Sequence, residues 1–234
     1  MARYGMVIDL DRCTGCQSCV VACRAENNVP SAGPEMTGED RAIFWMRVLS
    51  SEKGEGTRRR TQFLPRPCMH CDNPPCVKVC PVKATYRNPE GLVGQVYARC
   101  IGCRYCTVAC PYTARSFNWF APEWPEEMRQ LLNPDVAVRP KGVVEKCSLC
   151  VQRLRRAKEK ARKEERDLRD EELHRLPACA ETCPAEAITF GDLDDPESLV
   201  SRLAGSPRAF RLLEELGTKP KVHYLAEARF DESR

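Results

Sequence analysis

Sixteen of the 234 residues are cysteine, and they fall into four groups of four. The first and third groups share the spacing C-x2-C-x2-C-x3-C, the second widens its middle gap to four residues, and the fourth contains a 28-residue insertion. Thiolates grouped at such spacings hold metal ions or inorganic clusters, or oxidise to disulfides. The groups are Cys13, Cys16, Cys19 and Cys23; Cys68, Cys71, Cys76 and Cys80; Cys100, Cys103, Cys106 and Cys110; and Cys147, Cys150, Cys179 and Cys183.

The C-x2-C-x2-C-x3-C-P run is typical of bacterial ferredoxins that hold two [4Fe–4S] clusters. Three thiolates on a short loop reach three irons of one cubane, and the fourth reaches a second cluster. The proline that follows the last cysteine of three groups disfavours helical angles at that cysteine and redirects the chain. Each pair of groups therefore predicts two clusters with crossed ligands, and the whole chain predicts four [4Fe–4S] clusters.

Structural zinc and a disulfide framework are the alternatives to clusters. Zinc sites use two close cysteine pairs that lie well apart in the sequence, whereas three or four cysteines crowd into each group here. Cysteine makes up about 7% of the chain, below the level of a disulfide scaffold. His70 lies between Cys68 and Cys71, but that group already has four thiolates. We expect His70 to support the site rather than to ligate.

Composition favours a loop-rich chain with a modest core. Aromatic residues make up 7% of the sequence, and there are 18 prolines and 13 glycines. The 37 basic residues nearly balance the 33 acidic ones, and a net charge of +4 gives no argument for nucleic acid binding. We expect the basic run at 58–60 to be a solvated loop. No apolar run of 18 residues and no N-terminal signal peptide is present, so we expect no membrane span.

The pattern between the groups predicts short elements. We expect a hairpin around Asn88–Gly91 because N-P-E-G is a turn sequence, and a proline-rich loop at 121–142. We expect an exposed charged helix at 151–175, supported by opposite charges four residues apart, such as Lys160/Glu164 and Arg166/Asp170. The fold class is therefore α+β and loop-rich, with two bacterial-ferredoxin-like modules. The other expected strands are 4–10, 43–49, 187–191 and 222–225, and the other helices are 20–27, 196–204 and 207–216.

The four groups, together with CMHCDNPPCVKVCP at 68–81 and TCPAEAITFGDLDDPES at 182–198, resemble the iron–sulfur subunit of respiratory molybdoenzyme complexes. That family includes subunits of polysulfide, tetrathionate, arsenate and dimethyl sulfoxide reductases. The stretch 133–153 is also similar to the iron–sulfur subunit of alternative complex III. One departure is that Arg24, not proline, follows Cys23, which we expect to loosen the local turn.

The resemblance implies which cysteines share a cluster. It pairs the first group with the fourth, in an outer module of residues 1–60 plus 143–234. It pairs the second group with the third, in an inner module of residues 61–142 that includes the connecting loop at 121–142. The implied ligand sets are Cys13, Cys16, Cys19 and Cys183; Cys147, Cys150, Cys179 and Cys23; Cys68, Cys71, Cys76 and Cys110; and Cys100, Cys103, Cys106 and Cys80.

The resemblance also implies the role and the partners. The protein would relay single electrons between a molybdopterin catalytic subunit and a membrane subunit that handles quinone, and would not be an enzyme by itself. The alternatives are a subunit of a quinol-oxidising complex of the alternative complex III type, or a freestanding polyferredoxin carrier. The resemblance also implies a peripheral location at the membrane. The protein would lie on the periplasmic side if a twin-arginine partner exports the folded chain, or on the cytoplasmic side. Cations beside the cysteines could raise cluster potentials, namely Arg12, Lys78, Arg99, Arg104 and Lys146.

Overall fold

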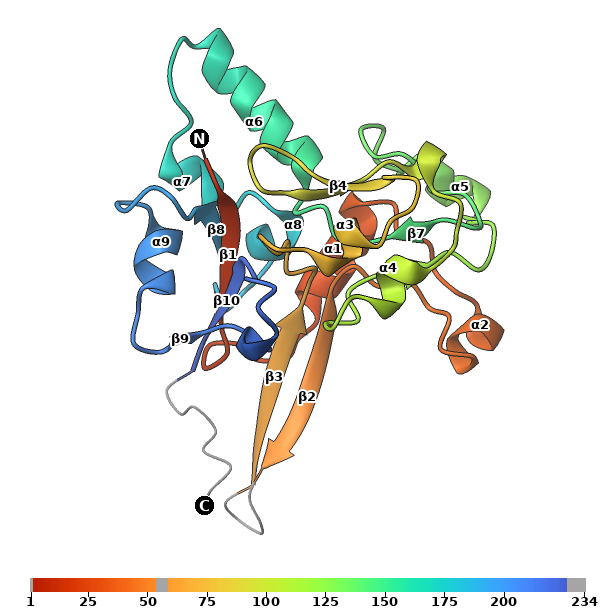
Figure 1. Ribbon diagram of the computed structural model, residues 1–234, viewed down its shortest axis with the longest axis horizontal. Coiled ribbons are helices and arrows are strands. Elements are labelled where there is room, and N and C mark those ends of the chain that lie inside the picture. Colours follow the sequence, from red (N-terminus) through yellow and green to blue (C-terminus); the bar gives the residue numbers. More distant parts are fainter. Residues whose placement is uncertain (1, 54–58, 227–234) are drawn as a thin grey trace.

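The computed structural model describes residues 2–53 and 59–226. Residue 58 of the basic run therefore lies outside the described residues. Small sheets and short helices surround the cysteine loops (Figure 1), as the α+β, loop-rich prediction requires. Within the described part of the chain, no helix is both long enough and apolar enough to cross a membrane.

The largest sheet joins the two ends of the chain. Its order is β8-β1-β10-β9, in which β1 (Tyr4–Asp9) runs parallel to β10 (Val222–Leu225) and antiparallel to β8 (Ile188–Asp192). The predicted strands at both ends are thus confirmed. Both faces of this sheet are buried. Met6, Phe190 and Tyr224 lie in the main apolar core, and Val7 packs on the opposite face in a second cluster with Leu225.

The segment that follows β8 in the chain corrects one prediction. The helix α9 (Leu199–Ala204) forms as expected and is capped by Ser198, whose hydroxyl accepts a hydrogen bond from Ser201 N–H at 3.1 Å. The helix predicted at 207–216 is wrong, because the segment forms β9 (Ala209–Phe210) and the 3₁₀ turn η3 (Glu214–Leu216). The Phe210 ring packs on Tyr224 with ring centres 5.8 Å apart, which favours a strand on β10.

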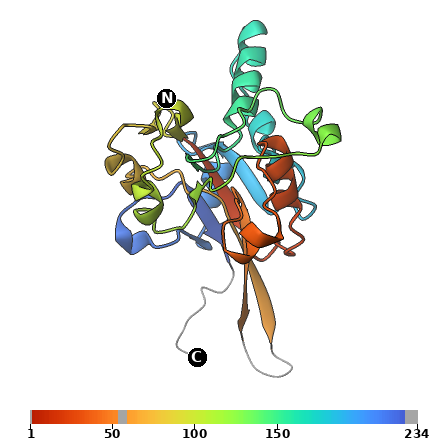
Figure 2. The same cartoon turned by 90° about the vertical axis from the view of Figure 1, so that its right-hand side faces the viewer.

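Within the described residues, three two-stranded ribbons complete the set of strands. The longest pairs β2 (Arg47–Lys53) with β3 (Arg60–Arg66), and it projects from the body in both views (Figures 1 and 2). Its first strand begins later than predicted, because Ile43, Trp45 and Met46 turn into the core. The predicted hairpin is confirmed as β4 (Thr85–Arg87) and β5 (Val93–Gln95). The third ribbon pairs β6 (Ser116–Phe117) with β7 (Val144–Glu145).

Four short helices begin inside or beside the cysteine groups. They are α1 (Ser18–Glu26), α3 (Pro75–Lys78), α4 (Tyr105–Val108) and α8 (Ala178–Glu181). The helix α1 packs on α8, and α3 packs on α4. Each contact joins two different cysteine groups, the first with the fourth and the second with the third. The remaining short elements are α2 (Pro34–Gly38), η2 (Tyr97–Arg99) and, within the otherwise irregular loop at 121–142, α5 (Glu126–Arg129).

The charged helix is shorter than predicted. It spans α6 (Val151–Lys163), and a separate turn, α7 (Asp170–Leu173), follows. Glu165 has a φ of 51°, which breaks the helix. The expected Arg166/Asp170 pair is wrong, because Arg166 instead contacts Glu164 and Glu172, both at 2.7 Å.

Candidate functional site

The four cysteine loops share one backbone feature. The residue before the second cysteine of each group has a positive φ, which turns successive backbone N–H groups into a concave surface that suits a negatively charged sulfur cluster. Glycine supplies this conformation at two of the positions, and at the other two the side chains tolerate some strain. The residues are Gly15 (70°), His70 (43°), Gly102 (71°) and Leu149 (54°).

A second feature recurs after each Cys-Pro pair. The third residue after the cysteine is left-handed, and the fourth is an alanine whose backbone N–H points back to the cysteine sulfur. The left-handed residues are Lys83 (51°), Thr113 (49°) and Glu186 (47°). The alanine donors are Ala84 to Cys80 at 3.2 Å, Ala187 to Cys183 at 3.3 Å, and Ala114 to Cys110. Three groups therefore hold their last sulfur by the same local hydrogen bond.

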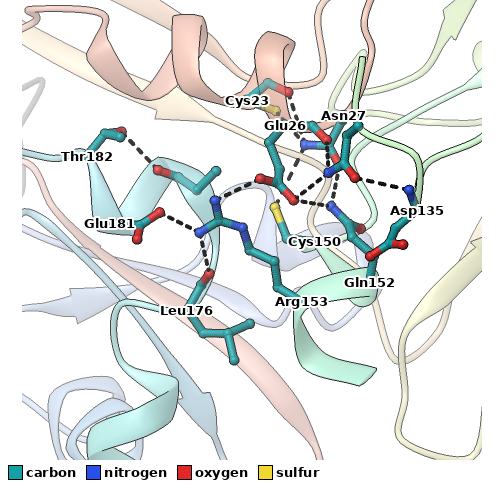
Figure 3. Close-up of polar contacts among 12 residues, drawn as sticks. Cys23, Glu26, Asn27, Asp135, Cys150, Gln152, Arg153, Leu176, Glu181 and Thr182 are labelled. Atoms are coloured by element: carbon teal, nitrogen blue, oxygen red, sulfur yellow. Dashed lines mark hydrogen bonds and ion pairs between the residues drawn. The ribbon is translucent and has the colours of Figure 1, made fainter. Parts of the chain in front are cut away.

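The last cysteine of the first group, Cys23, has no such backbone donor among the described residues. The expected loosening of the turn at Arg24 is not found. The helix α1 instead continues past Arg24 to Glu26, because Arg24, unlike proline, fits the interior of a helix. The backbone N–H of Asn27, four residues after Cys23, then donates to the Cys23 carbonyl at 3.1 Å instead of to its sulfur. The side-chain Nδ2 of Asn27 donates to the Cys23 carbonyl at 3.0 Å and also lies 3.7 Å from the Sγ atoms of both Cys23 and Cys150 (Figure 3).

A polar network orients the Asn27 amide. The Gln152 side chain donates to Asn27 Oδ1 at 3.2 Å and to Glu26 Oε1 at 2.9 Å. Glu26 also accepts from Arg153 at 2.7 Å (Figure 3), and Arg153 contacts Glu181. Because Oδ1 is engaged by a donor, Nδ2 faces the two sulfurs. This network joins α1, α6 and α8 around one set of cysteines.

Two cavities each collect thiols from different groups. Cys13, Cys16, Cys19 and Cys183 line one cavity together. Cys68, Cys71, Cys76 and Cys110 line another, beside His70 and Arg115. In both, three cysteines come from one group and the fourth comes from the last position of another group. These are the first and third sets that the family resemblance implied.

Three of the sulfurs that surround Cys23 come from the fourth group. Burial raises the pKa of Cys23, and the neighbouring sulfurs of Cys147, Cys150 and Cys179 raise it further. Burial likewise raises the pKa of Cys179, with Cys150 and Cys147 adding to it. Cys23 therefore lies among the fourth group's thiols. For the remaining set, the structure brings Cys106 near Cys100, and α3, which precedes Cys80, packs on α4.

The sets follow one another through the protein. Cys19 of the first set is near Cys23 and Cys179 of the second. Cys147 of the second set is near Cys68 of the third. Cys76 of the third set is near Cys106 of the fourth. The two ends of this row carry the exposed cysteines, Cys16 and Cys103.

The donor set fits iron–sulfur clusters better than the alternatives. All sixteen cysteines lie among the described residues, and no disulfide joins any two of them there. Tetrahedral zinc requires sulfurs roughly 3.8 Å apart, given Zn–S bonds of about 2.3 Å. Among residues 2–53 and 59–226, no three His, Cys, Asp or Glu side chains gather closely enough to hold a single metal ion. A cubane spaces its thiolates more widely, because each one binds a different iron.

Burial makes the thiolate form of these cysteines unfavourable unless a positive charge lies nearby. Burial and neighbouring sulfurs raise the pKa of Cys19, Cys71 and Cys147 to about 12. Such thiols stay protonated unless a cation stabilises the thiolate, and coordination to a metal deprotonates a thiol outright. The sites are therefore suited to iron, which would bring the missing positive charge.

His70 supports the loops through both ring nitrogens. Its Nδ1 accepts from Val93 N–H at 3.0 Å, so the proton lies on Nε2, which donates to the Cys147 carbonyl at 3.0 Å. Burial lowers the His70 pKa far below its usual value, with Lys146 and Lys221 adding to the effect, and the ring is neutral. His70 thus links the second cysteine loop to the fourth by hydrogen bonds, as its expected supporting role requires.

The cations differ from the sequence expectation. Arg12, Lys78, Arg99 and Arg104 are exposed, while Lys146 is 2% exposed and donates to the Cys147 carbonyl at 2.8 Å. Arg115 was not among the predicted cations, yet it is 6% exposed and donates to Cys76 Sγ at 3.3 Å. Asn27 and the three alanine donors were not predicted either. The alanines had a signal, since C-P-x-x-A recurs at 80–84, 110–114 and 183–187.

Comparison with known proteins agrees with this site. Residues 12–84 and residues 59–125 each match a 4Fe-4S dicluster domain. The protein is 53% identical to the iron-sulfur cluster-binding subunit of the menaquinone reductase of Nitratidesulfovibrio vulgaris, over 96% of its own length and 89% of that relative. It is 34% identical to the iron-sulfur subunit of the arsenate respiratory reductase of a Shewanella species (95% and 96%). It is also 34% identical to one chain of the polysulfide reductase of Wolinella succinogenes (97% and 96%).

The family matches differ from the spatial arrangement in one respect. The match at 12–84 covers the first two cysteine groups in sequence, whereas the first group lies beside the fourth in space. A match along the sequence cannot follow ligands that come from a distant segment. The resemblance found in the cysteine groups is confirmed by the relatives. The protein belongs to the family of [4Fe–4S] iron–sulfur subunits of reductase complexes.

Proposed function

We propose that the protein relays single electrons through four [4Fe–4S] clusters between a molybdopterin catalytic subunit and a membrane subunit that handles quinone. The observation that carries the proposal is the row of four thiol sets between exposed Cys16 and exposed Cys103. A row with an exposed position at each end suits entry of an electron at one end and exit at the other.

The proposed ligands are all sixteen cysteines, in crossed sets. Each set takes three thiolates from one group and one from its partner group, the first with the fourth and the second with the third. The proposed outer module is 1–60 plus 143–234, and the inner module is 61–142. Support comes from the two shared cavities and from the sulfurs around Cys23.

A bound [4Fe–4S] cluster takes up and releases one electron at a time, without making or breaking bonds in a substrate. The protein's own residues then space, insulate and tune the clusters. The alanine N–H groups and the Asn27 amide donate to cysteine sulfurs, which stabilises the more negative, reduced state. Buried side chains such as Met69, Leu149 and Ile188 keep water away from the loops.

The partners follow from the relatives' roles. One relative is named as part of a menaquinone reductase, and others as parts of arsenate and polysulfide reductases. A catalytic subunit and a quinone subunit would occupy opposite ends of the row, and the protein alone would catalyse no reaction. The location would be peripheral at the membrane, on the outer face by co-export with a twin-arginine partner.

Anaerobic affinity purification of the protein from its own host tests the proposal. We expect a molybdopterin-containing polypeptide and a polytopic membrane protein to copurify, and a menaquinol analogue to reduce the clusters of that complex. A protein that purifies alone would instead be a freestanding carrier. Copurification with a quinone-binding membrane protein, without molybdopterin, would favour a complex of the alternative complex III type.

A further inference from the structure

Arg115 is a buried cation held in one orientation. Its Nη2 donates to Cys76 Sγ at 3.3 Å, and its Nη1 donates to Thr85 Oγ1 at 3.2 Å and to Gln95 Oε1 at 3.3 Å. Its side chain is 6% exposed. Within the part of the chain that the structure describes, no carboxylate forms an ion pair with it, so its positive charge faces sulfur.

The sulfurs around Arg115 belong to two different ligand sets. Arg115 lines the cavity of the third set together with Cys68 and Cys76. It also lines a second cavity together with Cys103, which belongs to the fourth set. Cys76 of the third set and Cys106 of the fourth pack in one buried cluster. Arg115 therefore stands where these two sets meet.

We propose that Arg115 is a shared fixed charge that raises the midpoint potentials of both inner clusters, the one on Cys68, Cys71, Cys76 and Cys110 and the one on Cys100, Cys103, Cys106 and Cys80. The proposal rests on the ligand sets of the proposed function. A single side chain thereby favours electron uptake at two neighbouring sites.

The physical reason is the charge that reduction adds. Each cluster becomes more negative by one unit when it gains an electron, and a nearby cation stabilises that state. A guanidinium stays protonated at every working pH, so the effect does not titrate. Solvent screens an exposed charge but screens a buried one much less. Arg104, in the same cysteine loop as Cys103 and Cys106, is exposed and serves as the matched control.

Two substitutions remove the net charge in different ways. Arg115→Gln deletes it, and Gln95→Glu keeps Arg115 but places a carboxylate of the same shape beside it. We expect each to shift the reduced-to-oxidised ratio of both inner clusters at least tenfold toward the oxidised form, which is about 59 mV for one electron. The two outer clusters should not shift. Arg115→Lys, which keeps the charge, and Arg104→Gln should each shift the ratio less than threefold.

The measurement is EPR-monitored redox titration of the purified complex. Unchanged inner potentials in Gln95→Glu would overturn the proposal even if Arg115→Gln fails to load its clusters. An equal shift in Arg115→Lys would overturn it too, because the effect would then come from the lost hydrogen bonds. Absence of the inner clusters from the wild-type protein would instead contradict the proposed function itself, so the two failures are distinguishable.

Discussion

The side-chain nitrogen of Asn27 lies 3.7 Å from the sulfur of Cys23, four residues earlier in the chain. In the three other groups, the backbone N–H of an alanine occupies that relationship to the last cysteine. A side chain has replaced a backbone donor because α1 continues past Cys23 and uses the Asn27 N–H for its own hydrogen bond. Unlike a backbone donor, a side-chain donor can be removed by substitution.

Asn27→Leu should lower the midpoint potential of the cluster held by Cys23, Cys147, Cys150 and Cys179. The variant keeps a side chain of similar size but loses two N–H···S contacts, and hydrogen bonds to sulfur raise cluster potentials. Redox-titrated EPR would measure the shift. Asn73→Leu is the control, because Asn73 is exposed and donates to the Gly217 carbonyl. Equal potentials in wild type and Asn27→Leu would rule out this role.

Cys23→Ala should damage the cluster held by the fourth group and leave the first group's cluster intact. Cys23 lies among the sulfurs of Cys147, Cys150 and Cys179. EPR of the reduced variant, with each cluster assigned beforehand by its potential, gives the readout. Loss confined to the cluster of Cys13, Cys16 and Cys19 would refute the crossed arrangement.

Cys100→Ser should remove or convert one inner cluster while the others survive. A serine keeps the shape of the side chain but replaces the thiolate. In the wild-type protein the backbone N–H of Val144 donates to the Cys100 sulfur at 3.5 Å. Iron content per chain should fall by about one to four atoms, because each cubane holds four irons. A spectrum and an iron content identical to wild type would show that Cys100 is not a ligand.

The buried pair of Arg139 and Glu145 should matter for stability. Their side chains are 1% and 0% exposed and lie 2.8 Å apart, and Arg139 also donates to the carbonyls of Asn27 and Asn28. Arg139→Met leaves a buried carboxylate unpaired, and we expect a loss of about 3–5 kcal/mol in the free energy of unfolding. Anaerobic urea denaturation followed by tryptophan fluorescence would measure it.

Two comparisons make that measurement decisive. The double variant Arg139→Met/Glu145→Met should recover part of the loss, because no unpaired charge remains. The Asn27 and Asn28 carbonyls and the Trp45 indole N–H still lose their partners, so the recovery should be incomplete. Arg211→Met, which breaks an exposed pair with Glu214, should cost less than about 1 kcal/mol. A single variant as stable as Arg211→Met would mean that the buried pair contributes little.

The sequence predicted those features that depend on local pattern. The cysteine spacing, the N-P-E-G hairpin and the strands at 4–10 and 222–225 follow from residues adjacent in the chain, and the structure contains them. The helix predicted at 207–216 failed because tertiary packing of Phe210 on Tyr224 outweighs local helical preference. The break of the charged helix at Glu165 likewise left no signal in the charge pattern.

The residues that tune the site were the hardest to predict. Arg115 reaches Cys76, 39 positions away in the chain, and Gln152 reaches Asn27 across 125 positions. Such contacts depend on how loops pack, which no spacing encodes. The cations that adjoin cysteines in sequence proved mostly exposed, because adjacency in the chain does not fix the direction of a side chain.

Iron and acid-labile sulfide per chain test the central claim most directly. After anaerobic purification we expect about sixteen iron and sixteen sulfide for each chain, since each of four cubanes contains four of each. Plasma emission spectrometry and a colorimetric sulfide assay give both numbers from one sample. Stoichiometric zinc without sulfide, or cysteines linked as disulfides in a colourless protein, would contradict the account.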